Sequence, residues 1–110
     1  MEHSIYVVSD KERKHFKVGY SNYKTVRDRL KQYISHNPEV VIQGFFKVPY
    51  KLYEKSIQTE LKKLGYIPCP IKGQKEWFNG SVELTLINEI IDKITEDLKY
   101  TKLLEICDVD

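Results

Sequence analysis

Two short apolar runs, each with one polar group at its centre, lie near the start of the chain over residues 4–9 and 15–20, with the charged segment 10–14 between them. Two such runs joined by a charged connection predict an antiparallel β-hairpin, in which side chains alternate between the two faces of each strand. In such a hairpin Tyr6 and Lys17 lie on neighbouring strands.

The same alternation predicts which side chains share a face of the hairpin. In the first strand Ile5 and Val7 point one way, and Tyr6 and Val8 point the other way. In the second strand Phe16, Val18 and Tyr20 lie on one face, and Lys17 and Gly19 lie on the opposite face. Gly19 has no side chain, so we expect another group to approach it closely.

Helical spacing of apolar residues follows the hairpin. It predicts a helix that starts after Ser21-Asn22 and ends near His36, a second over about 50–64, and a third over about 82–98. Gly65 suits the C-terminal cap of the second helix. The segment 40–48 is rich in β-branched and aromatic residues and predicts a third strand.

These elements follow the order β-β-α-β-α-α and predict an α+β fold, a small three-stranded antiparallel sheet flanked by helices. Residues 1–110 form one domain with a core over about 4–98. The tripeptide 76–78 is a candidate for a short additional strand. The last dozen residues either continue as helix or fray.

Composition narrows the class of protein. The N-terminus is polar and no apolar run is long enough to cross a membrane, so we expect an intracellular protein of the cytoplasm or nucleus of a host cell, without a membrane partner. Cys69 and Cys107 lack metal-type spacing and are expected to be reduced thiols.

Charge is distributed unevenly along the chain. Residues 1–75 hold 15 Lys and Arg against 7 Asp and Glu, whereas residues 76–110 hold 3 against 9. A basic first part suits a polyanionic partner such as nucleic acid. Tyr6 beside Lys17, with an arginine arriving from the next helix, is a group suited to phosphate chemistry.

The segments Ser4-Ile5-Tyr6 and Lys17-Val18-Gly19, with Arg29 and Glu54 after them, resemble the ordered motifs of the GIY-YIG nuclease superfamily. The most similar variety is the phage and large-DNA-virus branch, in which the second motif often reads Lys-Ile-Gly. That branch carries a Glu-Trp-Phe element before the last helix, present here at 76–78. The resemblance covers about residues 4–98.

The resemblance implies roles for two hairpin residues. Tyr6 matches the tyrosine that helps to activate the attacking water. A free phenol titrates near pH 10, and a neighbouring cation lowers that pKa. Lys17 occupies the position of the family's second tyrosine, where it could make Tyr6 a better base. The alternative is that both residues belong to an ordinary sheet surface.

Two helix residues complete the implied catalytic set. Arg29 matches the arginine that holds phosphate oxygens, and Arg27 lies about 200° around the helix from it. Glu54 matches the metal-binding glutamate and implies Mg²⁺ or Mn²⁺ as cofactor. Glu60, about 240° further around its helix, points elsewhere. An exposed arginine and a surface glutamate paired with lysine are the ordinary alternatives.

Some positions depart from the family pattern. The homing endonucleases carry a histidine one turn after the arginine, and this chain has Tyr33 there, with His36 three residues further on. Asn79 is a candidate for the family's late asparagine. Glu76 is a second candidate acid, although its tripeptide reads mainly as structural. The residues expected to contact nucleic acid are Lys14, His15, Tyr20, Arg27, Lys31 and His36.

The sequence therefore predicts a Mg²⁺-dependent endonuclease that hydrolyses phosphodiester bonds, with DNA as the expected substrate and little sequence specificity of its own. A recruiting protein partner or a homodimer would supply targeting. The alternatives are a catalytically inactive nucleic-acid-binding module on the same fold, or a small protein-interaction domain.

Overall fold

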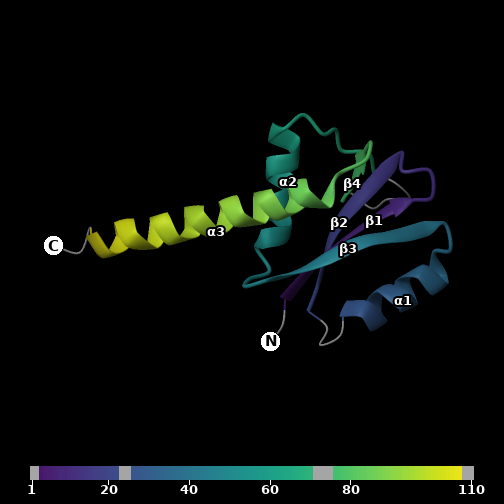
Figure 1. The fold of residues 1–110 in the computed structure, drawn as a ribbon, viewed down its shortest axis with the longest axis horizontal. Coiled ribbons are helices and arrows are strands. Elements are labelled where there is room, and N and C mark those ends of the chain that lie inside the picture. The colour runs from purple at the N-terminus through teal and green to yellow at the C-terminus, as the bar shows by residue number, and fades with distance from the viewer. Residues whose placement is uncertain (1–2, 23–25, 71–75, 108–110) are drawn as a thin grey trace.

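A computed structural model describes residues 3–22, 26–70 and 76–107, with the side chains at positions 26, 27, 29 and 100–107 outside that description. Its elements, in chain order, are β1 (His3–Asp10), β2 (His15–Ser21), α1 (Val26–His36), β3 (Val40–Val48), α2 (Tyr53–Lys63), β4 (Trp77–Asn79) and α3 (Leu84–Cys107) (Figure 1).

The strands form one antiparallel sheet in the order β3-β1-β2-β4, which confirms the α+β class. The predicted number of three strands is wrong. Trp77–Asn79 adds a fourth strand by pairing with the first three residues of β2, His15 to Lys17. A three-residue strand is too short to show a period in the sequence, and it forms here because β2 offers an unpaired edge.

The helices differ from prediction mainly at their ends. α2 begins at Tyr53 rather than near residue 50, because residues 50–53 form a tight turn closed by the Tyr53 N–H on the Tyr50 carbonyl at 3.3 Å. Gly65, with φ of 98°, follows the end of α2 as expected of a helix cap. α3 starts two residues late at Leu84 and continues as one helix to Cys107.

The sheet packs on both faces. The face that we call the α3 face carries Ile5, Val7, Phe16 and Val18 against α2 and α3. The opposite face, called the α1 face, carries Val8 and Trp77 against Leu30 of α1, with Tyr6 and Tyr33 beside them. The predicted division of strand side chains between two faces is confirmed. Figure 1 shows α1 on one side of the sheet and α2 with α3 on the other.

The α3 helix packs on the sheet through its first half, where Ile87, Ile91 and Ile94 are buried. Its second half extends away from the body of the molecule (Figure 1). Within the described ranges, no helix combines the length and the apolar character that crossing a membrane requires.

Candidate active site

Tyr6 lies on the α1 face, directly opposite Gly19 of β2. A methyl group added at Gly19 would overlap the phenol ring, with the hydroxyl end of that ring nearest. The ring therefore lies across the backbone of Gly19. The prediction that Gly19 admits the close approach of another group is confirmed, and that group is Tyr6.

Lys17 is buried beneath two aromatic rings. Its side chain is 8% exposed, and its Nζ atom lies 5.9 Å from the ring centroid of Tyr6 and 5.2 Å from that of Tyr33. The two rings are 6.4 Å apart. A cation over aromatic faces gains electrostatic stabilisation from the rings, and more so where water is excluded. The structure thus brings Tyr6 and Lys17 together and adds Tyr33 to them.

The edge of β2 is covered by two different elements. β4 pairs with β2 only as far as Lys17. At the next residue, α2 contacts β2 instead: the Gln58 side chain donates a hydrogen bond of 3.1 Å to the Val18 carbonyl. Glu54 lies one helical turn before Gln58, and residues four apart share a helix face. Glu54 therefore faces the same edge of β2, near Lys17.

The electrostatics of Glu54 agree with that position. Burial raises the pKa of its carboxyl group, and the negative charge of Glu76 raises it further. The cations Lys51, Lys17 and Lys55 lower that pKa in part. Glu54 forms no ion pair with any residue that the structure describes. It is a half-buried carboxylate that a cation would stabilise.

Glu76 immediately precedes Trp77, the residue paired with Lys17. The negative charge of Glu76 acts on Tyr33 as well as on Glu54. Burial raises the pKa of Tyr33, and the charges of Glu39 and Glu76 raise that pKa further. The carboxylates of Glu54 and Glu76 thus lie near enough to act on each other, in the neighbourhood of Lys17. Among the described residues, no group of three or more His, Cys, Asp and Glu side chains is placed to hold a metal ion.

The other members of the predicted catalytic set and their competitors are placed as follows. Arg29 and Arg27 both belong to α1, and Arg29 lies one helical turn before Tyr33. The side chains of both arginines lie outside the described part of the structure. Glu60 points to the opposite side of α2, as expected, where it forms ion pairs with Lys93 at 2.9 Å and Lys63 at 3.4 Å.

Two residues predicted to contact nucleic acid have partners inside the fold. His15 pairs with Asp10 at 2.9 Å in the β1–β2 turn, an interaction that helps to lower the pKa of Asp10 against the effect of burial. Tyr20 packs on the α3 face, accepts or donates a hydrogen bond of 2.6 Å with His3, and has Lys51 over its ring. Both lie apart from Tyr6.

The remaining predicted contacts are exposed. Lys14, in the β1–β2 turn, pairs with Glu12 at 3.0 Å, while Lys31 and His36 lie on the surface of α1. Asn79, the candidate late asparagine, is exposed and pairs with His15 at the far end of β4. Lys14 and Asn79 thus lie with His15 at the β1–β2 turn end of the sheet, several residues along the strands from Tyr6.

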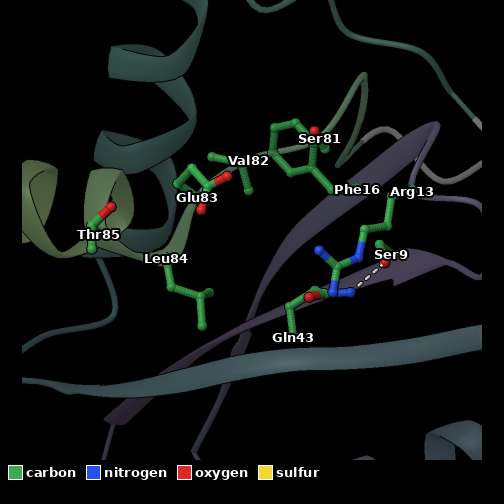
Figure 2. A pocket seen from close by; sticks show the side chains of 9 residues that line it. All are labelled: Ser9, Arg13, Phe16, Gln43, Ser81, Val82, Glu83, Leu84 and Thr85. Atoms are coloured by element: carbon green, nitrogen blue, oxygen red, sulfur yellow. Dashed lines mark hydrogen bonds between the residues drawn. The ribbon is translucent and has the colours of Figure 1, made fainter.

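A hollow of about 270 Å³ opens on the α3 face, at the start of α3 (Figure 2). Its lining includes Ser9, Gln43 and Phe16, and Gln43 donates a hydrogen bond of 2.8 Å to the Ser9 hydroxyl. None of the predicted catalytic residues lines it. The sheet therefore separates this hollow from the group around Lys17.

Three residues of the site were not in the predicted set. Tyr33 was noted only as a departure, Gln58 carries no chemical signature, and Phe45 belongs to an apolar run. Phe45 pairs with Tyr6 and is 42% exposed, whereas Phe46 packs against the core. The strand period is the signal that could have separated these two phenylalanines.

Comparison with known proteins adds one match. The T5orf172 domain model matches residues 3–95, which contain every described element from β1 to the packed half of α3. No curated protein and no solved structure matches the chain. Since the match spans most of the sequence, the chain belongs to the T5orf172 domain family, a family of nuclease-related domains.

Proposed function

We propose that the chain is a metal-dependent endonuclease that hydrolyses phosphodiester bonds in nucleic acid, with DNA as the expected substrate. One observation carries the proposal: Lys17 is buried against the ring of Tyr6, and the half-buried carboxylate of Glu54 is close enough for the charge of Lys17 to lower its pKa in part. The nuclease-related family of the chain and its resemblance to the GIY-YIG motifs support the same function.

Tyr6 is the proposed general base. A phenol is a poor base near neutral pH, and an ammonium group favours the phenolate form. Lys17 is the nearby cation, and its burial strengthens the effect because little water screens it. Tyr33 suits the role less, because its surroundings raise its pKa.

The proposed reaction is hydrolysis by direct attack of water. The Tyr6 phenolate takes a proton as the water oxygen bonds to phosphorus. The P–O bond on the opposite side breaks, and the leaving oxygen takes a proton from solvent. The Arg29 guanidinium is proposed to bind the phosphate oxygens and so to stabilise the charge of the transition state.

The Glu54 carboxylate is suited to bind a Mg²⁺ or Mn²⁺ ion, and Glu76 is a second carboxylate that could contribute to the same site. Mg²⁺ keeps several waters and is commonly bound by one or two carboxylates together with substrate phosphate. The raised pKa of Glu54, caused first by burial and then by Glu76, marks a place where added positive charge is favourable. Such an ion would neutralise charge on the reacting phosphate.

The proposal is tested by incubating the protein with supercoiled plasmid and Mg²⁺ or Mn²⁺, with EDTA as the control. Conversion to nicked or linear plasmid only with metal supports it. Salt-sensitive binding without cleavage would instead indicate the nucleic-acid-binding module. A melting-temperature rise on adding Mn²⁺, lost in Glu54→Gln, tests metal binding independently of activity.

A further inference from the structure

Phe45 occupies a place beside the proposed base that the chemistry above does not use. In the β1–β3 pairing it lies directly opposite Tyr6. Opposed residues of antiparallel strands project on the same face, with their Cβ atoms about 4.5–5.5 Å apart. The phenyl group is therefore the neighbour of Tyr6 on the side away from Gly19.

Phe45 is also left open to solvent. It is 42% exposed, while the next residue, Phe46, packs into the core. The α1 helix covers the α1 face around Val8, Val40 and Ile42, toward the other end of β3. Tyr6 itself packs with Tyr33 of α1, whereas Phe45, beside it on the outer strand β3, stays exposed. Lys47, two residues further along β3, is exposed on the same face.

An exposed aromatic ring followed by a cation is the combination that binds single-stranded nucleic acid. Bases stack on the ring, and the backbone follows the positive charge. In a continuous duplex each base is covered above and below by its neighbours, so a phenyl ring on a sheet can stack only on a base that has left the helix.

We infer that Phe45 is a stacking platform for an unpaired base next to the scissile phosphate, so that this site takes single-stranded or locally unpaired nucleic acid in preference to a continuous duplex. The inference rests on the proposed function, because it assumes that a phosphate is bound at Tyr6. It concerns binding, and it can therefore be tested separately from cleavage.

The test measures binding of the full chain in EDTA, where no cleavage occurs, to a fluorescein-labelled 12-mer and to its blunt duplex by anisotropy. Phe45→Ala should weaken binding of the single strand about 10-fold, since one base–aromatic stack is worth roughly 1–3 kcal/mol. Duplex binding should change less than about twofold. Val41→Ala is the matched control, because Val41 is a similarly exposed (39%) apolar residue near the other end of β3.

Phe45→Trp provides a second measurement. The indole should keep single-strand affinity, and its fluorescence should be quenched by the 12-mer and not by the duplex, while native Trp77 is buried at 5% exposure. Equal losses for both ligands in Phe45→Ala, no loss for either, or an equal effect of Val41→Ala would overturn the inference. So would a change of oligomeric state in Phe45→Ala, which would assign the exposed edge to a protein contact.

These outcomes separate the inference from the proposed function. Plasmid cleavage together with unchanged single-strand binding by Phe45→Ala removes only the stacking role. Normal stacking without any metal-dependent cleavage removes only the nuclease activity.

Discussion

Lys17 is the residue on which most of the proposed chemistry depends. An ammonium group loses much of its hydration when it is 8% exposed, and the rings of Tyr6 and Tyr33 are among the groups that stabilise it there. A hydrophobic residue of similar length would fill the same space without a charge to desolvate. A buried charge at this position suits a functional role, in which the Lys17 ammonium acts on the neighbouring Tyr6.

If Lys17 lowers the pKa of Tyr6, then Lys17→Met should move the alkaline activation of cleavage to higher pH, because the phenolate forms later. Lys17→Tyr should retain more activity than Lys17→Met, since it restores a polar partner. The measurement is the single-turnover cleavage rate between about pH 6 and 10. Tyr33→Phe is the control and should leave the midpoint in place. Identical profiles for wild type and Lys17→Met would make Lys17 a bystander.

Glu54 makes a prediction about stability. Its pKa is raised in the folded protein, so the folded state holds the proton to higher pH than the unfolded state does. Stability therefore falls as pH rises from the ordinary value of 4.5 through the raised one, and the penalty is complete above it. Glu54→Gln should melt at a higher temperature than wild type at about pH 7, and this gain should vanish near pH 3.5.

Glu60→Gln is the control of opposite sign on the same helix. Lys93 and Lys63 lower the pKa of Glu60, which therefore contributes stability above its ordinary pKa and loses it as pH falls. Its replacement should lower the melting temperature at neutral pH and have no effect in acid. A lower melting temperature for Glu54→Gln at pH 7 would contradict the electrostatic account of the site.

At the scale of the elements, the β1–β2 pair accommodates the Tyr6 ring because Gly19, opposite it, has no side chain. Gly19→Ala would force the phenol ring to move, and a clash of this kind costs about 1–3 kcal/mol. We expect the melting temperature to fall by roughly 4–8 °C for each kcal/mol, and cleavage to be lost with it.

Gly44→Ala is the matched control for Gly19→Ala. It is also a strand glycine, but its added methyl would meet the end of the flexible Leu84 side chain at 2.9 Å, on the other face of the sheet. It should cost less stability and keep the cleavage rate per folded molecule. Equal losses of cleavage in the two variants would mean that the position of Tyr6 is not critical.

The α2 helix packs on the sheet through its buried face, and Gln58 adds a side-chain hydrogen bond to the Val18 carbonyl of β2. Gln58→Leu would leave that carbonyl without its donor, at a cost of about 1–3 kcal/mol, and would loosen the helix face that carries Glu54. We expect a lower cleavage rate with little change in nucleic-acid affinity. Thr59→Ala, which removes only a local bond to Lys55, should have almost no effect. A normal rate in Gln58→Leu would contradict this positioning role.

The parts of the site that sequence could predict are those that a strand period determines. Alternation placed Tyr6 and Lys17 on one face and marked Gly19 as a place of close approach. It left β4 undecided: residues 76–78 were a candidate strand, but Trp77–Asn79 is too short to show a period and depends on a distant partner for its pairing. Gln58 was missed for a similar reason, since a glutamine on a helix shows no preference for one strand carbonyl.

At the scale of the whole molecule, the uneven charge of the sequence follows the architecture. The basic residues 1–75 contain β1 to β3, α1 and α2, and thus most of the candidate site, while the acidic residues 76–110 are mainly α3. Figure 1 shows α3 leading away from the sheet. A polyanion that approaches the α1 face would therefore meet the basic part of the chain first.

Supercoiled-plasmid cleavage by three proteins tests the central claim most directly. Wild type and Glu60→Gln should nick the plasmid in Mg²⁺ at similar rates, because Glu60 faces Lys63 and Lys93 on the other side of α2. Glu54→Gln should show no metal-dependent nicking while still shifting the plasmid in a gel. Undiminished nicking by Glu54→Gln, or an equal loss in Glu60→Gln, would contradict the account.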